Sequence, residues 1–152
     1  MLISRLLKPS LINLNLKSTK RTNAIYETAS LLNGHPSLLN FEGFYQELLA
    51  RERVETTCIG NSIAFPHART DHVKSLILAV GRSNEGILFE NCNQIVRLIF
   101  VIGTPKRMTT EYLTVVGALA RILKDPSNRE ALLKAEKPED FLQIIEDFEG
   151  KL

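Results

Sequence analysis

One histidine follows directly on a short apolar segment whose backbone is restricted. Ile63, Ala64 and Phe65 suit a buried strand, and Pro66 ends it because proline has no N–H to donate to a neighbouring strand. A neutral imidazole is a good nucleophile near pH 7, since its ordinary pKa is about 6.5. The spacing therefore allows nucleophilic chemistry at His67. It is also compatible with a histidine that follows a strand by chance or is buried in the core.

Residues upstream of this histidine offer partners for an anionic group. A tight turn contains Asn61 and Ser62, which present an amide, a hydroxyl and backbone N–H groups. Arg51 and Arg53 lie at the end of a predicted helix, and a guanidinium can bind two phosphate oxygens at once. On the residues alone, Asn61 and Ser62 also suit an ordinary turn. An arginine in the last turn of a helix also stabilises the helix dipole, and composition does not choose between Arg51 and Arg53.

The elements that would position these residues alternate along the chain. Runs typical of strands cover residues 11–16, 63–65 and 76–80, a short edge piece covers 86–89, and a near-continuous apolar run at 95–102 suits a central strand. Helices are predicted from a cap at 17–19 to about 32, at 41–53, from a cap at Thr109 or Thr110 to about 123, at 128–135 and at 138–148. This alternation predicts an α/β fold, with helices packed on both faces of a single mixed sheet.

Length and composition limit the class of protein. At 152 residues, 44% hydrophobic and 24% charged, the chain fits one soluble globular domain, 1–152. A net charge of +2 gives no argument for nucleic-acid binding, and the basic start is read as a solvated surface rather than a transit peptide or nucleic-acid arm. No apolar run is long enough for membrane insertion. Cys58 and Cys92 are expected to be free buried thiols, and a cytoplasmic location is expected.

The run Gly60-Asn61-Ser62-Ile63-Ala64-Phe65-Pro66-His67 resembles a known active-site signature. It is that of the type-2 enzyme IIA domains of the bacterial phosphoenolpyruvate-dependent phosphotransferase system, the fructose/mannitol class with its nitrogen-regulatory relative. Segments 49–52, 85–89, 96–102 and 110–113 also fall in the family's order, so the resemblance covers about residues 11–150. It implies the family's α/β sandwich fold.

The resemblance also implies roles for the residues. His67 would accept a phosphoryl group from the phosphocarrier protein HPr and pass it to a IIB cysteine, or signal with it to a regulated target protein. The family's spacing selects Arg51 as the cation, and Ser62 and Asn61 are candidate hydrogen-bond donors. Arg69 and His72 could rim the site. No cofactor or metal is implied, because a donor that already carries phosphohistidine needs no nucleotide or Mg²⁺.

Tyr112 is a departure from the family, which commonly has a second histidine at this position. The tyrosine could replace it as a hydrogen-bond donor, or pack on the core with its hydroxyl reaching water. It could also mark a protein that binds partners without being phosphorylated. Within the family, segments 86–90 and 95–102 look more like the nitrogen-regulatory branch than the sugar-specific one. Three functions therefore stay open: a regulatory IIA protein, a sugar-specific IIA component and a non-phosphorylated binding module.

Overall fold

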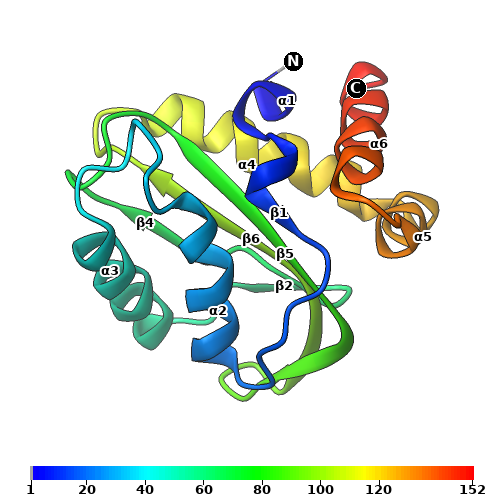
Figure 1. Ribbon diagram of the computed structural model, residues 1–152, viewed down its shortest axis with the longest axis horizontal. Coiled ribbons are helices and arrows are strands. Elements are labelled where there is room, and N and C mark those ends of the chain that lie inside the picture. Colours follow the sequence, from blue (N-terminus) through cyan, green and yellow to red (C-terminus); the bar gives the residue numbers. More distant parts are fainter. Residues whose placement is uncertain (1) are drawn as a thin grey trace.

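The sheet is built around the long apolar run in the second half of the chain. In the computed structural model, which describes residues 2–152, this run becomes β6 and pairs along both of its edges (Figure 1). The strands are β1 (Ile12–Asn13), β2 (Cys58–Gly60), β3 (Ile63–Ala64), β4 (His67–Arg69), β5 (Ile77–Phe89) and β6 (Gln94–Thr104). β6 is antiparallel to β5 and parallel to β3 and β4, whereas β1 is parallel to β5 and β2 is antiparallel to β3. The single mixed sheet and its central strand are thus confirmed.

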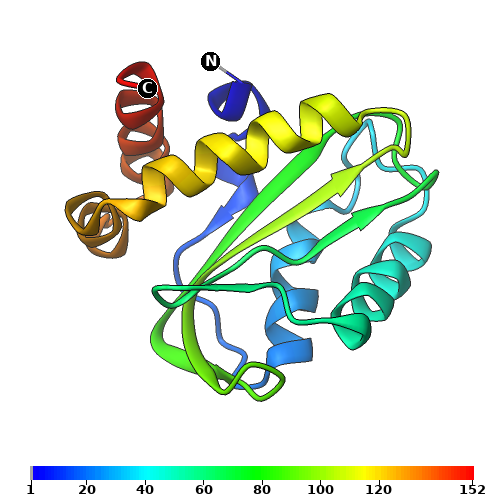
Figure 2. The same ribbon diagram turned by 180° about the vertical axis from the view of Figure 1, so that it is seen from behind.

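Helices cover both faces of this sheet, as predicted. α2 and α3 lie on one face and α4 crosses the other, and Figures 1 and 2 show these faces from opposite sides. α1, α5 and α6 pack with one another or with α4 beyond the β1 edge. The α-helices are α1 (Leu2–Leu6), α2 (Arg21–Ala29), α3 (Phe41–Val54), α4 (Thr109–Lys124), α5 (Pro126–Lys134) and α6 (Pro138–Gly150), with 3-10 turns at Pro9–Leu11 and Ser30–Leu32. α5 and α6 each begin with a proline, which suits the first helical position.

Two glycines, Gly43 in α3 and Gly103 in β6, leave space for close packing between α3 and its neighbours. Phe44 of α3 is fully buried, and its ring occupies the space beside Gly103 of β6, where an added Cβ would lie 2.8 Å from the ring. At the start of the same helix, Gly43 leaves room for the ring of His72. His72, considered above as a rim residue, therefore packs against the first turn of α3. These contacts fix the helix that carries Arg51 against the sheet.

Two strand boundaries differ from expectation. The first strand was expected at 11–16, but β1 has two residues, although the N–H of Leu16 still donates to the carbonyl of Arg82 at 3.0 Å. The segment 86–89 is no separate edge piece, because β5 continues through it and forms a hairpin with β6. A register shift between Arg82 and Ile87 interrupts the pairing. The polar residues at this irregularity hid the continuity of the strand in the sequence.

The predictions of two helix N-caps are also wrong. Ser18 does not cap α2; its hydroxyl donates to Glu27 at 2.7 Å, and Lys20 precedes the helix without a side-chain bond. Neither threonine caps α4, whose N-cap is Met108, again without a side-chain bond. The hydroxyl of Thr109 instead takes part in contacts with β4 that are described below. In both places a partner distant in sequence competes for the capping side chain.

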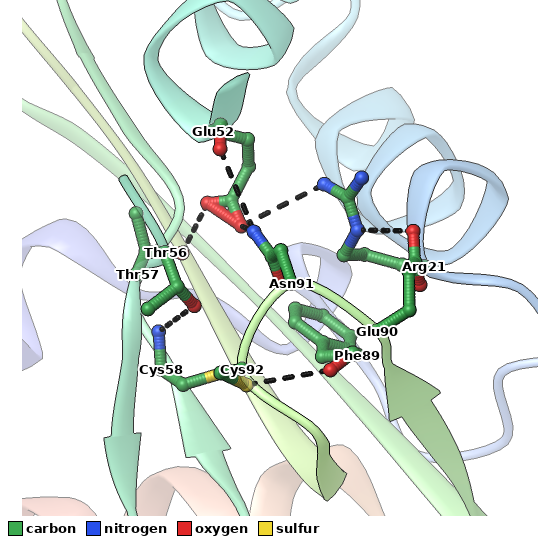
Figure 3. The surroundings of a disulfide bond; sticks show 9 residues. All are labelled: Arg21, Glu52, Thr56, Thr57, Cys58, Phe89, Glu90, Asn91 and Cys92. Atoms are coloured by element: carbon green, nitrogen blue, oxygen red, sulfur yellow. Dashed lines mark hydrogen bonds and ion pairs between the residues drawn. A yellow bond between two sulfur atoms is a disulfide. The ribbon is translucent and has the colours of Figure 1, made fainter. Parts of the chain in front are cut away.

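The cysteines are joined, so the expectation of two free thiols is wrong. Cys58 of β2 and Cys92 of the β5–β6 turn form a disulfide, with their Cα atoms 6.7 Å apart (Figure 3). That separation lies within the range that a disulfide can bridge. The two residues are 34 positions apart in sequence, and only the pairing of β2 and the β5–β6 hairpin within one sheet brings them together.

Arg82 ties three separate parts of the chain together from within the core. It is 6% exposed, and its Nε donates to the carbonyl of Leu14 at 3.3 Å. Its Nη1 donates to the carbonyls of Leu132 and Ala135 at 3.0 and 2.8 Å. The guanidinium thus satisfies carbonyls at the end of α5, where a positive charge also complements the helix dipole.

We expect Arg82→Met to lower the free energy of unfolding by about 2–4 kcal/mol, because it leaves buried carbonyls without donors. Urea denaturation followed by circular dichroism measures the loss. Arg121→Met, at an exposed position on α4, is the matched control and should change the value by less than about 0.5 kcal/mol. Equal losses in the two variants would contradict the assigned role of Arg82.

Candidate active site

A cavity of about 490 Å³ opens where α3, β4 and α4 meet. Three of the residues singled out in the sequence, His67, Arg51 and Tyr112, line it together. The full lining consists of Glu47, Ala50 and Arg51 of α3, His67, Ala68 and Arg69 of β4, and Tyr112 of α4. The two guanidinium groups outnumber the one acidic side chain of the lining, Glu47, so the cavity is suited to an anion.

His67 is held by one hydrogen bond that also decides its chemistry. Its Nδ1 lies 2.9 Å from the carbonyl oxygen of Phe65, and a carbonyl can only accept, so Nδ1 carries the proton. In the neutral ring Nε2 therefore keeps its lone pair. Burial lowers the pKa of His67 below 6.5. The hydrogen bond to Phe65 opposes this shift, the charge of Arg51 adds to it, and Glu52 and Arg69 have smaller effects in opposite directions. At neutral pH the ring is uncharged.

Arg51 reaches the cavity from the last turn of α3. Its Nη1 donates to the carbonyl of Glu55 at 2.7 Å, which fixes the guanidinium beside the helix end. The other N–H groups of the guanidinium can donate to a ligand. Arg53, two residues further along, is exposed and does not line the cavity. The structure thus separates the two arginines that composition could not distinguish.

Tyr112 lies in the first turn of α4, next to His67. The centroids of the two rings are 5.6 Å apart and their planes are tilted by 40°. Burial raises the pKa of Tyr112 above 10, although Arg51 and Arg69 oppose the shift. The hydroxyl therefore stays protonated and able to donate at physiological pH. The ring also packs on the core, so the packing and donor interpretations of this residue are compatible.

Arg69 has a larger part in the cavity than the sequence suggested. Its Nη2 donates to the carbonyl of Lys106 at 3.2 Å and to the hydroxyl of Thr109 at 2.9 Å, which ties β4 to the start of α4. The sequence did hold a signal for it. His67 and Arg69 are two residues apart on one strand, and such residues point to the same side of a sheet.

Asn61 and Ser62 are not brought to the cavity. Both adopt left-handed backbone conformations, with φ of 56° and 65°, in the turn between β2 and β3. β3 pairs with β6 at Leu98, whereas His67 pairs with Ile102, which places the turn more than about 13 Å along the strand direction from the histidine. Their predicted role as donors to a group on His67 gains no support from the structure, because the turn lies at the other end of the strand pair.

The remaining histidine makes a local structural contact. His35 is partly buried, and its Nδ1 accepts the N–H of Ser37 at 3.0 Å. Within residues 2–152 no group of three or more His, Cys, Asp or Glu side chains could hold a metal ion. In the same range, none of the helices combines the length and apolar character needed to cross a bilayer.

Comparison with known proteins places this chain in a family. The family described as "Phosphoenolpyruvate-dependent sugar phosphotransferase system, EIIA 2" matches residues 5–148. A fructose-specific EIIABC component of Bacillus subtilis (strain 168) is 32% identical over 146 residues, which are 95% of this chain and 23% of that protein. A nitrogen regulatory protein of Pseudomonas aeruginosa is 26% identical over 149 residues, 97% of both chains.

Comparison with solved structures finds proteins of the same family. The crystal structure of nitrogen regulatory protein IIA-Ntr from Neisseria meningitidis superposes with a TM-score of 0.87 and 30% identity, over 95% of this chain and 99% of that one. The chain spans about a quarter of the length of the B. subtilis relative but nearly all of the two regulatory ones. Because the family match extends over almost the whole sequence, the chain belongs to the EIIA type-2 family of the phosphoenolpyruvate-dependent sugar phosphotransferase system.

Proposed function

We propose that this protein is a phosphoryl carrier in which Nε2 of His67 accepts a phosphoryl group from phospho-HPr and later gives it up. The observation that carries the proposal is the bond from Nδ1 to the Phe65 carbonyl, which leaves Nε2 unprotonated in a cavity with two guanidinium groups. In the step, Nε2 bonds to phosphorus as the bond to the HPr histidine breaks. The HPr nitrogen keeps that electron pair and takes a proton from solvent. No nucleotide or metal is required.

The charges of the cavity suit such a group. A phosphoryl group on histidine carries roughly two negative charges near neutral pH. Arg51 and Arg69 together supply two positive charges, and the hydroxyl of Tyr112 supplies a neutral donor beside the ring. In phosphoryl transfer most of the protein's contribution is positioning and electrostatic stabilisation. Tyr112 thus replaces the family's second histidine as a donor, and Arg69 supplies the second cation.

Within the family we favour the nitrogen-regulatory role, in which a target protein reads the phosphorylation state. Support comes from the fold comparison, in which the nitrogen regulatory protein of N. meningitidis superposes with a TM-score of 0.87 at 30% identity. The second candidate is a fructose-type IIA component that passes phosphate to a IIB cysteine, and the 32% identity to the EIIABC component favours it. Either role, with HPr as donor, is proposed to operate in the cytoplasm. A non-phosphorylated binding module is the third candidate, suggested by Tyr112 alone.

We predict that His67 is the phosphorylation site. With phosphoenolpyruvate, enzyme I and HPr, mass spectrometry should find one acid-labile phosphoryl group, which His67→Ala abolishes because the nucleophile is removed. His35→Ala is the matched control; it removes a ring outside the cavity that makes only a local contact to Ser37 and should leave labelling intact. Undiminished labelling of His67→Ala would refute the proposal.

The second test separates the two arginines of α3. Arg51→Lys replaces a guanidinium, which can bind two phosphate oxygens at once, by an ammonium group that acts as a point charge. It should slow transfer from phospho-HPr by a factor on the order of 10²–10³, the usual effect of losing a charge-stabilising donor. Arg53→Lys should be nearly silent, because Arg53 does not line the cavity. Stopped-flow or quenched transfer rates measure both. Similar rates for the two variants would show that Arg51 has no special role.

The third test concerns the tyrosine. Tyr112→Phe should raise the transfer barrier by about 0.5–1.5 kcal/mol, the value of one hydrogen bond, while Tyr112→His should retain or increase the rate. Single-turnover rates from phospho-HPr measure both. If the wild type takes no phosphate and Tyr112→His does, the natural protein is a binding module and the carrier function fails.

A further inference from the structure

We propose that the Cys58–Cys92 disulfide is a thiol–disulfide exchange site for dithiol reductants, and that its redox state sets the rate at which His67 accepts phosphate. The proposal rests on the carrier function proposed above. It stands on a different part of the molecule, the junction of α3, β2 and the β5–β6 turn, which Figure 3 shows from close by.

The residue before each cysteine binds the same carboxylate. Thr57, which precedes Cys58, donates from its hydroxyl to Glu52 Oε2 at 2.5 Å. Asn91, which precedes Cys92, donates from Nδ2 to Glu52 Oε1 at 3.2 Å. Figure 3 shows Thr57, Asn91 and Glu52 gathered on one side of the disulfide. The covalent bond thus holds together the two strands of chain that bind one acidic group.

Glu52 depends strongly on these partners. Its side chain is only 1% exposed, and it forms an ion pair with Arg21, with Nη1 3.8 Å from Oε1. A buried carboxylate is costly unless it is hydrogen-bonded and paired. Movement of Asn91 away from Glu52 would therefore change the position or hydration of the carboxylate rather than leave it in place.

Two short connections lead from this cluster to the cavity. Glu52 directly follows Arg51 in α3, so a shift of its side chain acts on the last turns of the helix that hold the guanidinium. Separately, the carbonyl of Thr57 accepts the N–H of Phe65 at 2.9 Å, and the carbonyl of Phe65 accepts Nδ1 of His67 at 2.9 Å. The segment that carries the disulfide therefore contacts the supports of both the nucleophile and its cation.

The exchange chemistry is complete without a metal. One thiolate of the reductant attacks a sulfur of the disulfide, forms a mixed disulfide and releases the other cysteine as a thiol. The second thiol of the reductant then displaces the remaining cysteine. Two electrons and two protons pass to the protein, and the reductant becomes a disulfide. Both cysteines are partly exposed, so a reductant can reach them, and disulfides of cytosolic proteins are usually transient or redox-sensing.

Reduction should weaken the hydrogen bonds that Thr57 and Asn91 donate to Glu52, and it should slow the transfer of phosphate to His67. Oxidised and dithiothreitol-reduced protein, with redox state verified by mass spectrometry, are compared for transfer from phospho-HPr. We expect the oxidised form to be about three- to tenfold faster, the size of effect typical of couplings between neighbouring sites. The change should fall on kcat rather than on KM for phospho-HPr, because it acts on the supports of Arg51 and His67 inside the cavity.

Two variants make the comparison specific. The double variant Cys58→Ser/Cys92→Ser should transfer at the reduced rate and ignore the reductant. Glu52→Gln, with the disulfide intact, should show a smaller ratio between the oxidised and reduced rates, because the charge that links the disulfide to α3 is absent. Equal rates of oxidised and reduced wild type would overturn the proposal. Loss of the folded circular dichroism spectrum on reduction would overturn it too, since the bond would then be only structural.

A second measurement separates this inference from the carrier function. Nuclear magnetic resonance of the two redox forms without any phosphate donor should show shifts at the Arg51 guanidinium and the His67 ring, compared with an unshifted Arg121. If neither form takes phosphate but these shifts occur, the carrier function fails and the coupling stands. If both forms take phosphate equally and no shift occurs, the coupling alone fails.

Discussion

The bond between His67 and the carbonyl of Phe65 is the constraint on which the rest of the site depends. It requires a carbonyl that is not used in the sheet, and the interruption at Pro66 supplies one. The N–H of Phe65 pairs with Thr57 and the carbonyl of Pro66 pairs with Ile102 of β6, so the Phe65 carbonyl is left to accept from the imidazole. A proline between two short strands thus fixes the tautomer of the ring as well as its place.

The sequence predicted much of this arrangement, because local signals and family spacing identified the strand, the helix end and the position of Tyr112. It failed where the outcome depends on contacts between distant segments. Asn61 and Ser62 are close to His67 along the chain, but the pairing of β3 with β6 places them at the other end of the strands. The disulfide joins residues 34 positions apart, and nothing in either local sequence shows that they meet. Arg69 was undervalued because its partners, Lys106 and Thr109, become neighbours only after α4 packs beside β4.

The tyrosine beside His67 changes how the cavity can respond to pH. A second histidine, as the family commonly has, would add a group that titrates near neutral pH. Here that place is taken by Tyr112, whose pKa is raised by burial, so that its hydroxyl stays neutral near physiological pH. Tyr112 thus adds a hydrogen-bond donor beside His67 without adding a second group that titrates near neutral pH.

The way in which the two arginines are anchored has a consequence for signalling. Arg51 uses Nη1 for the Glu55 carbonyl, and Arg69 uses Nη2 for both of its contacts at the start of α4. Each guanidinium thus keeps N–H groups that can bind an anion without releasing the helix it supports. None of these contacts has to break for an anion to bind, so these anchors allow α3 and α4 to keep their positions when the cavity is filled. A partner protein that distinguishes the empty from the filled cavity would then recognise a change in surface charge rather than a change of shape.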